Sequence, residues 1–219
     1  MDKQMQIKIA ALALAVILIV AIISLFAGGG ELLAYASNDG MVVANSKSGK
    51  VIVKAKDTNA DSPVITANKR YVVYKSGFTL YALRTKGGAK AVKLVDTVGS
   101  FTVSQNGSTV YYAPYQGQGI FSIRIGKDKK PVTEIKPSGF IVQNMHFAGN
   151  LLCAEKYIKD NVTGKLTEAS ISGYNLKQKN EKILVPFKAA TASDPGVAPK
   201  IIGVTADRRR IYFFDYPEF

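Results

Sequence analysis

The side chains with the clearest potential for chemistry belong to two short runs of basic residues. They are Lys69 and Arg70, which stand before YVVY (71–74), and Arg208, Arg209 and Arg210, which stand before IYFFDYPEF (211–219). Each run falls where a turn is expected to join two strands. Guanidinium groups form paired hydrogen bonds with carboxylate and phosphate oxygens. We therefore predict that these residues bind an anionic envelope polymer, a lipid headgroup or an acidic protein surface; the alternative is that they are solvated loop tips.

Catalytic residues, metal ligands and a cofactor are not expected from this composition. The chain has one histidine, His146, and one cysteine, Cys153, so it cannot form an internal disulfide or a site with several thiolates. We interpret His146 as a core or groove residue, and Cys153 as a small buried hydrophobe. Glu155 and Asp160 could supply the two carboxylates of a glycoside hydrolase, but nothing in their spacing requires it.

Residues 9–27, IAALALAVILIVAIISLFA, form an uncharged apolar run that is long enough to approach the thickness of a bilayer as a helix. Because Lys3 and Lys8 precede the run, we expect residues 1–8 to be cytoplasmic and the rest of the chain to lie outside. The predicted segments are a cytoplasmic N-terminus (1–8), a transmembrane signal-anchor helix (9–27), a glycine linker (28–31) and an exported domain (32–219). A cleaved signal peptide is the alternative interpretation.

After Glu31 the sequence changes to short alternating runs that repeat. MVVANSKSGKVIV (41–53) aligns with TLYALRTKGGAKAV (79–92), IFSIRIGKDKKPV (120–132) and SGYNLKQKNEKILV (172–185). This alignment gives one shared position to Val43, Tyr81, Phe121 and Tyr174. Each copy follows a further apolar strand, and RIYFFDYPEF (210–219) supplies a fifth strand of that type.

A period near 40 residues, made of about four short strands, is typical of propeller blades. The fold class predicted for residues 32–219 is therefore an all-β, propeller-like array of four-stranded blades, with about four to five units. A β-sandwich with coincidental spacing is the alternative. The unit count leaves open a small closed ring, an open arc or part of a larger propeller.

Two stretches carry a resemblance to a known family. NDGMVVANSKSGKVIVKA (38–55) and SPVITANKRYVVYKSGFTLYALRTKGGAKAVKL (62–94) resemble the repeats of PQQ-like, quinoprotein-type β-propellers, in which LYALD is followed by a TG turn. The chain has no tryptophan, so the docking tryptophans of those repeats are missing. The resemblance implies a propeller fold and does not imply an activity.

The function predicted from these features is that of a non-catalytic, membrane-anchored binding or scaffold subunit in a cell-envelope assembly. The resembling family includes non-catalytic members that serve envelope machinery in this way. Protein partners are expected, and nucleic acid is not, because the domain is expected to lie outside the membrane, although a formal net charge of +13 would attract it. The alternative is a carbohydrate-active enzyme or a ligand sensor that uses the propeller groove.

Overall fold

The computed structural model describes residues 31–57, 59–128, 130–137, 139–159, 166–186, 197–205, 207 and 209–217. The predicted N-terminus (1–8), the predicted transmembrane helix (9–27) and most of the predicted linker (28–31) lie outside these residues and stay predictions. No helix in the described part of the chain is long and apolar enough to cross a bilayer.

The described residues form five antiparallel sheets and no helix. The first sheet contains β1 (Leu32–Ser37), β2 (Gly40–Asn45) and β3 (Val51–Ala55). The second contains β4 (Ala60–Ile65), β5 (Tyr71–Ser76), β6 (Thr79–Arg84) and β7 (Val92–Val95). The third contains β8 (Val98–Val103), β9 (Thr109–Pro114), β10 (Ile120–Arg124) and β11 (Val132–Ile135). The fourth contains β12 (Ile141–Ala148), β13 (Leu151–Lys159), β14 (Leu166–Asn175) and β15 (Asn180–Pro186), and the fifth contains β16 (Val197–Val204) and β17 (Ile211–Pro217).

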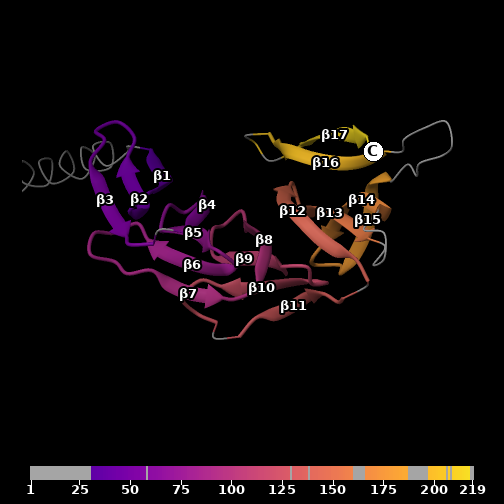
Figure 1. Ribbon diagram of the computed structural model, residues 1–219, viewed down its shortest axis with the longest axis horizontal. Helices are drawn as coiled ribbons and strands as arrows, with labels where there is room; N and C mark the ends of the chain where they lie inside the picture. The colour runs from indigo at the N-terminus through magenta and orange to yellow at the C-terminus, as the bar shows by residue number, and fades with distance from the viewer. Residues whose placement is uncertain are drawn as a thin grey trace, which may run out of the picture.

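The predicted repeat is confirmed at the level of whole strands. The four aligned hairpins are β2–β3, β6–β7, β10–β11 and β14–β15, and each is hydrogen-bonded to the strand that precedes it. Strands in the three complete sheets are paired in chain order. The sheets follow one another along an arc that is open between the first sheet and the fifth (Figure 1). Five successive sheets are the arrangement of propeller blades and not of a two-layer sandwich.

The second sheet and the third sheet each have a stacked aromatic pair on their two central strands. Tyr81 lies opposite Tyr74, with stacked rings whose centroids are 5.6 Å apart. Phe121 lies opposite Tyr112 in the same way, with the ring centroids 5.7 Å apart. The predicted equivalence of Tyr81 and Phe121 is therefore confirmed.

The predicted equivalence is wrong in the first and fourth sheets. Tyr81 lies three residues before the last residue of β6, and the residues at the same place in β2 and β14 are Val42 in the first sheet and Ser172 in the fourth. The sequence alignment had placed Val43 and Tyr174 there. Because side chains alternate between the two faces of a strand, a displacement by one residue reverses the face. Val43 points from the first sheet toward the second, whereas Tyr81 points from the second sheet back toward the first, and both pack in the cluster between these two sheets.

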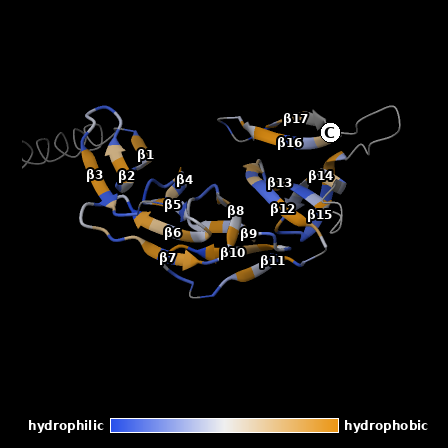
Figure 2. Ribbon diagram, in the orientation of Figure 1, coloured by the Kyte–Doolittle hydropathy of each residue, from blue (hydrophilic) through white to orange (hydrophobic). Residues whose placement is uncertain are grey.

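Apolar side chains fill the spaces between successive sheets. The apolar residues lie mainly on the strands, while the turns are hydrophilic (Figure 2). Examples of buried residues from the four interfaces are Met41 and Val72; Val73 and Val98; Ile120 and Leu152; and Ile171 and Ile201. Each of these clusters joins two neighbouring sheets, so each sheet depends on its neighbours for burial.

Candidate functional site

The predicted binding residues Lys69 and Arg70 lie in the turn between β4 and β5, and both are exposed. The Thr66 side chain shapes this turn, because its hydroxyl donates to Asn68 Oδ1 at 2.8 Å and accepts from the Tyr71 N–H at 3.0 Å. Arg70 N donates to the same Asn68 oxygen at 3.0 Å. Lys69 has a φ of 55°, and the hydrogen bonds on either side of it hold this left-handed conformation.

The other predicted residues lie in the corresponding turn of the fifth sheet. Arg209 N donates to Asp207 Oδ1 at 3.0 Å and Arg210 N donates to Thr205 Oγ1 at 3.1 Å, which repeats the pattern of the first turn. Arg209 and Arg210 are exposed, and Arg208 lies outside the described residues. Ser104 and Asn106 form a turn of the same kind in the third sheet.

Sequence reasoning missed the signal for these turns. The segments TANKRY (66–71), SQNGST (104–109) and TADRRR (205–210) all have a hydroxyl residue two positions before Asn or Asp. A short side chain of this kind can hydrogen-bond the backbone two to five residues ahead and so fix a tight turn. This motif marks the repeat independently of the hairpin alignment.

The two basic turns belong to the second and fifth sheets, which are not adjacent. Asn68 Nδ2 donates to Gly107 O at 3.1 Å, and Gln105 Nε2 donates to Gly149 O at 2.6 Å, so the turns of the second, third and fourth sheets follow one another. The turns of the third and fourth sheets, SQNGST (104–109) and Gly149–Asn150, carry no basic residue. A shared role for Arg209 and Arg210 with Lys69 and Arg70 stays a prediction.

Two further basic residues lie beside Lys69 and Arg70 in their own sheet. Thr85 N donates to Arg70 O at 3.0 Å, which holds the β4–β5 turn against the end of β6. Arg84 and Lys86, on either side of Thr85, are therefore neighbours of the turn, and both are exposed. Among the described residues no carboxylate pairs with any of these four cations. We call Lys69, Arg70, Arg84 and Lys86 the basic cluster.

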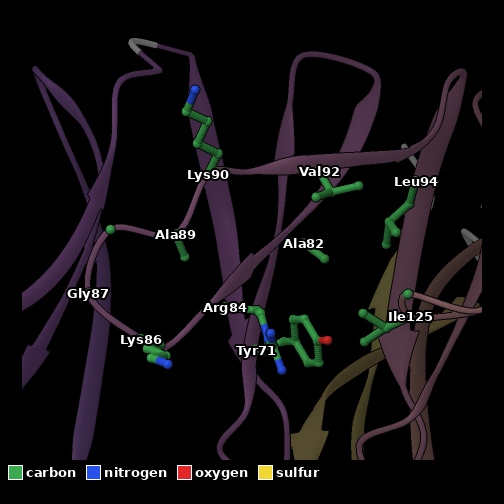
Figure 3. A pocket seen from close by; sticks show the side chains of 12 residues that line it. Tyr71, Ala82, Arg84, Lys86, Gly87, Ala89, Lys90, Val92, Leu94 and Ile125 are labelled. Atoms are coloured by element: carbon green, nitrogen blue, oxygen red, sulfur yellow. The ribbon is translucent and has the colours of Figure 1, made fainter.

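A cavity of about 370 Å³ opens beside the basic cluster, between the second and third sheets (Figure 3). The Arg84 guanidinium lies over the Tyr71 ring, 5.8 Å from its centroid. Lys90 extends away from the other labelled side chains in this view. Lys86 also lines the cavity. The remaining lining side chains are apolar and come from both sheets: Ala82, Ala89, Val92, Leu94 and Ile125. The cavity therefore combines an apolar interior with a cationic rim, and no acidic side chain is among the described residues that line it.

The opposite face of the arc carries an exposed aromatic pair. Phe78 lies in the β5–β6 turn and Tyr115 follows β9, and their ring centroids are 4.2 Å apart. Phe78 is 52% exposed and Tyr115 is 49% exposed. Tyrosine and phenylalanine are enriched in protein interfaces, so this pair is suited to contact a protein surface.

Glu155, which was considered for catalysis, is only 5% exposed and serves the structure. Its Oε1 accepts hydrogen bonds from Asn144 Nδ2 at 2.8 Å and from Ile201 N at 2.7 Å, while Lys200 Nζ lies 3.7 Å from Oε2. Ile201 and Lys200 belong to β16, so Glu155 ties the fifth sheet to the fourth. Asp160, its possible partner, lies outside the described residues.

His146 and Cys153 lie opposite each other on β12 and β13. His146 Nε2 is 3.0 Å from Asn144 Oδ1, and burial lowers the pKa of the imidazole despite the opposing effect of Glu155. Burial raises the pKa of the Cys153 thiol to about 11, so the thiol is protonated at neutral pH. In the described residues no three His, Cys, Asp or Glu side chains are grouped so that they could hold a metal ion.

Antiparallel sheets of up to four strands, arranged successively on an arc, define the described part of the chain as a β-propeller-type fold. No family model matches the chain, and no curated protein matches it. Solved structures do match.

The chain is similar to the β-propeller domain of Cps50 (Swd1) from Myceliophteria thermophila, with 16% identity, a TM-score of 0.58 and coverage of 85% of this chain and 59% of that domain. It is also similar to a protein described as TolB from Agrobacterium tumefaciens, with 13% identity, a TM-score of 0.53 and coverage of 84% and 77%. A Pyrococcus horikoshii acylaminoacyl peptidase matches with 14% identity and a TM-score of 0.50, over 86% of this chain and 34% of the peptidase. At these identities the likeness concerns the fold alone.

Proposed function

We propose that the chain is a non-catalytic binding or scaffold subunit of a cell-envelope assembly, anchored by residues 9–27 and exposing its propeller-type domain outside the membrane. The resemblance of residues 38–55 and 62–94 to PQQ-like repeats and the two lysines before the apolar run support this proposal. The observation that carries it is the basic cluster, which gathers four cations without a paired carboxylate among the described residues.

The basic cluster is suited to capture an anionic partner. Each exposed ion pair contributes only about 0–1 kcal/mol, so several cations must act on the same partner. A polymer with repeated charges, a sheet of lipid headgroups or an acidic protein surface meets this requirement, whereas an isolated small anion does not. Binding should weaken as salt rises, because exposed charges are screened over about 8 Å at physiological ionic strength.

The test compares two variants that remove the same charge from opposite faces. Arg84→Ser/Lys86→Ser reduces the basic cluster, and Lys56→Ser/Lys136→Ser removes two exposed lysines from the connections between sheets on the other face. The probes are poly-L-glutamate, polyphosphate and vesicles that contain phosphatidylglycerol. The first variant should bind at least one probe about 5- to 30-fold more weakly than the wild type at low salt, corresponding to about 1–2 kcal/mol for two charges.

The control variant should bind like the wild type. Equal losses in both variants would mean that net charge alone drives binding, and equal affinity in all three proteins would leave the basic cluster as solvated turns. Either result contradicts the proposal.

A ligand sensor is a second candidate, favoured by the cavity beside Arg84. Its volume of about 370 Å³ falls within the range of about 300–1,000 Å³ that is typical of small-molecule sites. A sensor would bind a small amphiphilic anion such as octanoate with saturation, and Arg84→Ser alone would weaken that binding up to about 5-fold. Octanoate binding that is insensitive to Arg84 would exclude this function for the cavity.

A further inference from the structure

A second cavity, of about 430 Å³, lies on the same face of the arc, between the third and fourth sheets. Its walls come from three turns: β8–β9, β12–β13 and β14–β15. Side chains at the ends of β9 and β12 form the remainder of the lining. None of these residues belongs to the basic cluster, so the second cavity is a separate structural feature.

Two aromatic rings form one wall of this cavity. Tyr111 and Phe147 pack edge to face, with ring centroids 5.3 Å apart, and each ring is partly exposed. Leu176 adds to the apolar surface. The edge-to-face arrangement leaves an open ring surface on one side and does not form a parallel slot in which a flat base could be sandwiched.

Side-chain amides form the rim of the cavity. They belong to Gln105, Asn106, Asn150, Asn175 and Gln178. Internal hydrogen bonds hold four of them. Gln105 Nε2 donates to Gly149 O at 2.6 Å, and Asn175 Oδ1 accepts from the Lys177 and Gln178 N–H groups at 3.1 and 3.2 Å. Asn106 Oδ1 accepts from Ser104 and Ser108, and Gln178 Oε1 accepts from Asn175 Nδ2 at 2.9 Å.

The rim retains hydrogen-bonding capacity after these internal bonds are made. An amide side chain has two donors and one acceptor. Within the described residues, the Asn150 side chain makes no hydrogen bond, and Gln178 uses its oxygen but neither of its N–H donors. Lys177 is the one charged residue among the described residues of the lining. The rim can therefore donate to and accept from a ligand that has many hydroxyl groups and no strong charge.

We propose that this cavity binds a neutral sugar unit. A sugar ring has an apolar face of C–H groups that can lie on the Tyr111 and Phe147 rings, and hydroxyl groups at its edge that can bond to the amides of the rim. The volume suits a small-molecule site. The proposal concerns binding and not cleavage, and it is independent of the basic cluster and of the membrane anchor.

The experiment measures the binding of chitotetraose, cellotetraose, maltotetraose and adenosine by saturation-transfer NMR and calorimetry. It uses the full chain in a detergent whose headgroup is not a sugar. At least one tetrasaccharide should bind with saturation, with upfield shifts of its ring protons where they meet the aromatic wall. Absence of saturable binding by all three tetrasaccharides, or tighter binding of adenosine, would overturn the proposal.

Variants then locate the site. Asn150→Ala and Gln178→Ala change exposed side chains and should each weaken sugar binding about 2- to 12-fold, as expected for one lost hydrogen bond. Gln143→Ala removes an exposed amide on β12 that does not line the cavity, and should leave binding unchanged. Arg84→Ser/Lys86→Ser should also leave it unchanged, which separates this proposal from the proposed function. Equal affinity in Asn150→Ala, Gln178→Ala and the wild type would place the sugar elsewhere and refute the assignment.

Discussion

Glu155 gives the sharpest stability prediction, because one buried carboxylate holds two sheets together. In Glu155→Ala the Ile201 N–H and the Asn144 amide lose their shared acceptor, since Oε1 accepts from both at 2.7 and 2.8 Å. A buried donor left without a partner costs about 1–3 kcal/mol. The exposed part of the contact, Lys200 at 3.7 Å, adds no more than about 1 kcal/mol. We expect a loss of about 3 kcal/mol in the stability of the contact between the fourth and fifth sheets.

The loss should be local, because each sheet is buried mainly against its neighbours. Amide hydrogen exchange followed by mass spectrometry resolves this. Peptides from β16 and β17 should exchange on the order of 100-fold faster in Glu155→Ala, while peptides from the second sheet should be unchanged. Glu155→Gln retains the Oε1 acceptor but not its charge, so its effect should be smaller, about 1 kcal/mol.

Glu134→Ala is the matched control for removing an acid. Glu134 lies on β11, and among the described residues it accepts a single hydrogen bond, from Ser122 Oγ at 2.6 Å, within its own sheet. It should leave exchange in β16 unchanged. If Glu155→Ala also leaves exchange in β16 unchanged, or if it accelerates exchange equally in all sheets, the described role of Glu155 is wrong.

Three further predictions concern the predicted membrane anchor, the stacked pair Tyr74–Tyr81 and the Cys153 thiol. Protease added to intact cells, after removal of any wall, should digest the chain after Gly30 and spare a tag at Met1, and the reverse pattern would invert the topology. Tyr81→Ala should lower the free energy of unfolding in urea by about 2 kcal/mol, because Tyr81 is only partly buried but stacks on Tyr74; a loss under about 0.5 kcal/mol would contradict this contact. Cys153 should react with iodoacetamide only upon unfolding, and rapid labelling of the native protein at pH 7 would refute the burial of the thiol. Because the pKa of the thiol is raised from 9.0 to about 11 in the folded state, that state should lose stability as pH rises from about 9 to 11.

The hairpins could be predicted from the sequence because they depend on local features. Alternating residues and a turn at a constant place define β2–β3 and β6–β7 without reference to distant contacts. The register between copies is less local. The sequence alignment matched Tyr174 with Tyr81 because both are aromatic. Ser172 is the structural equivalent of Tyr81, and only the strand pairing reveals this shift of two residues.

Only part of the basic cluster could be predicted from the sequence, for a related reason. Lys69 and Arg70 were identifiable as neighbours in the chain. Arg84 joins them only through the pairing of β5 with β6, in which Tyr71 lies opposite Arg84. The contact between Glu155 and Ile201 is similar, since it joins residues 46 positions apart in two different sheets. Side chains that meet through tertiary packing leave no regular spacing for a sequence pattern to record.

The position of the two cavities has a mechanical consequence. Each lies across the seam between two sheets, so a bound ligand fastens those two sheets to each other. A ligand at 100 times its dissociation constant contributes about 2.7 kcal/mol, which is comparable to the expected contribution of Glu155 at its own seam. Because each sheet is coupled only to its neighbours, that contribution stabilises one interface between sheets and leaves the other interfaces unchanged. Ligand binding would thus set the rigidity of individual interfaces between sheets, and force applied along the chain would separate the sheets first at interfaces without a ligand.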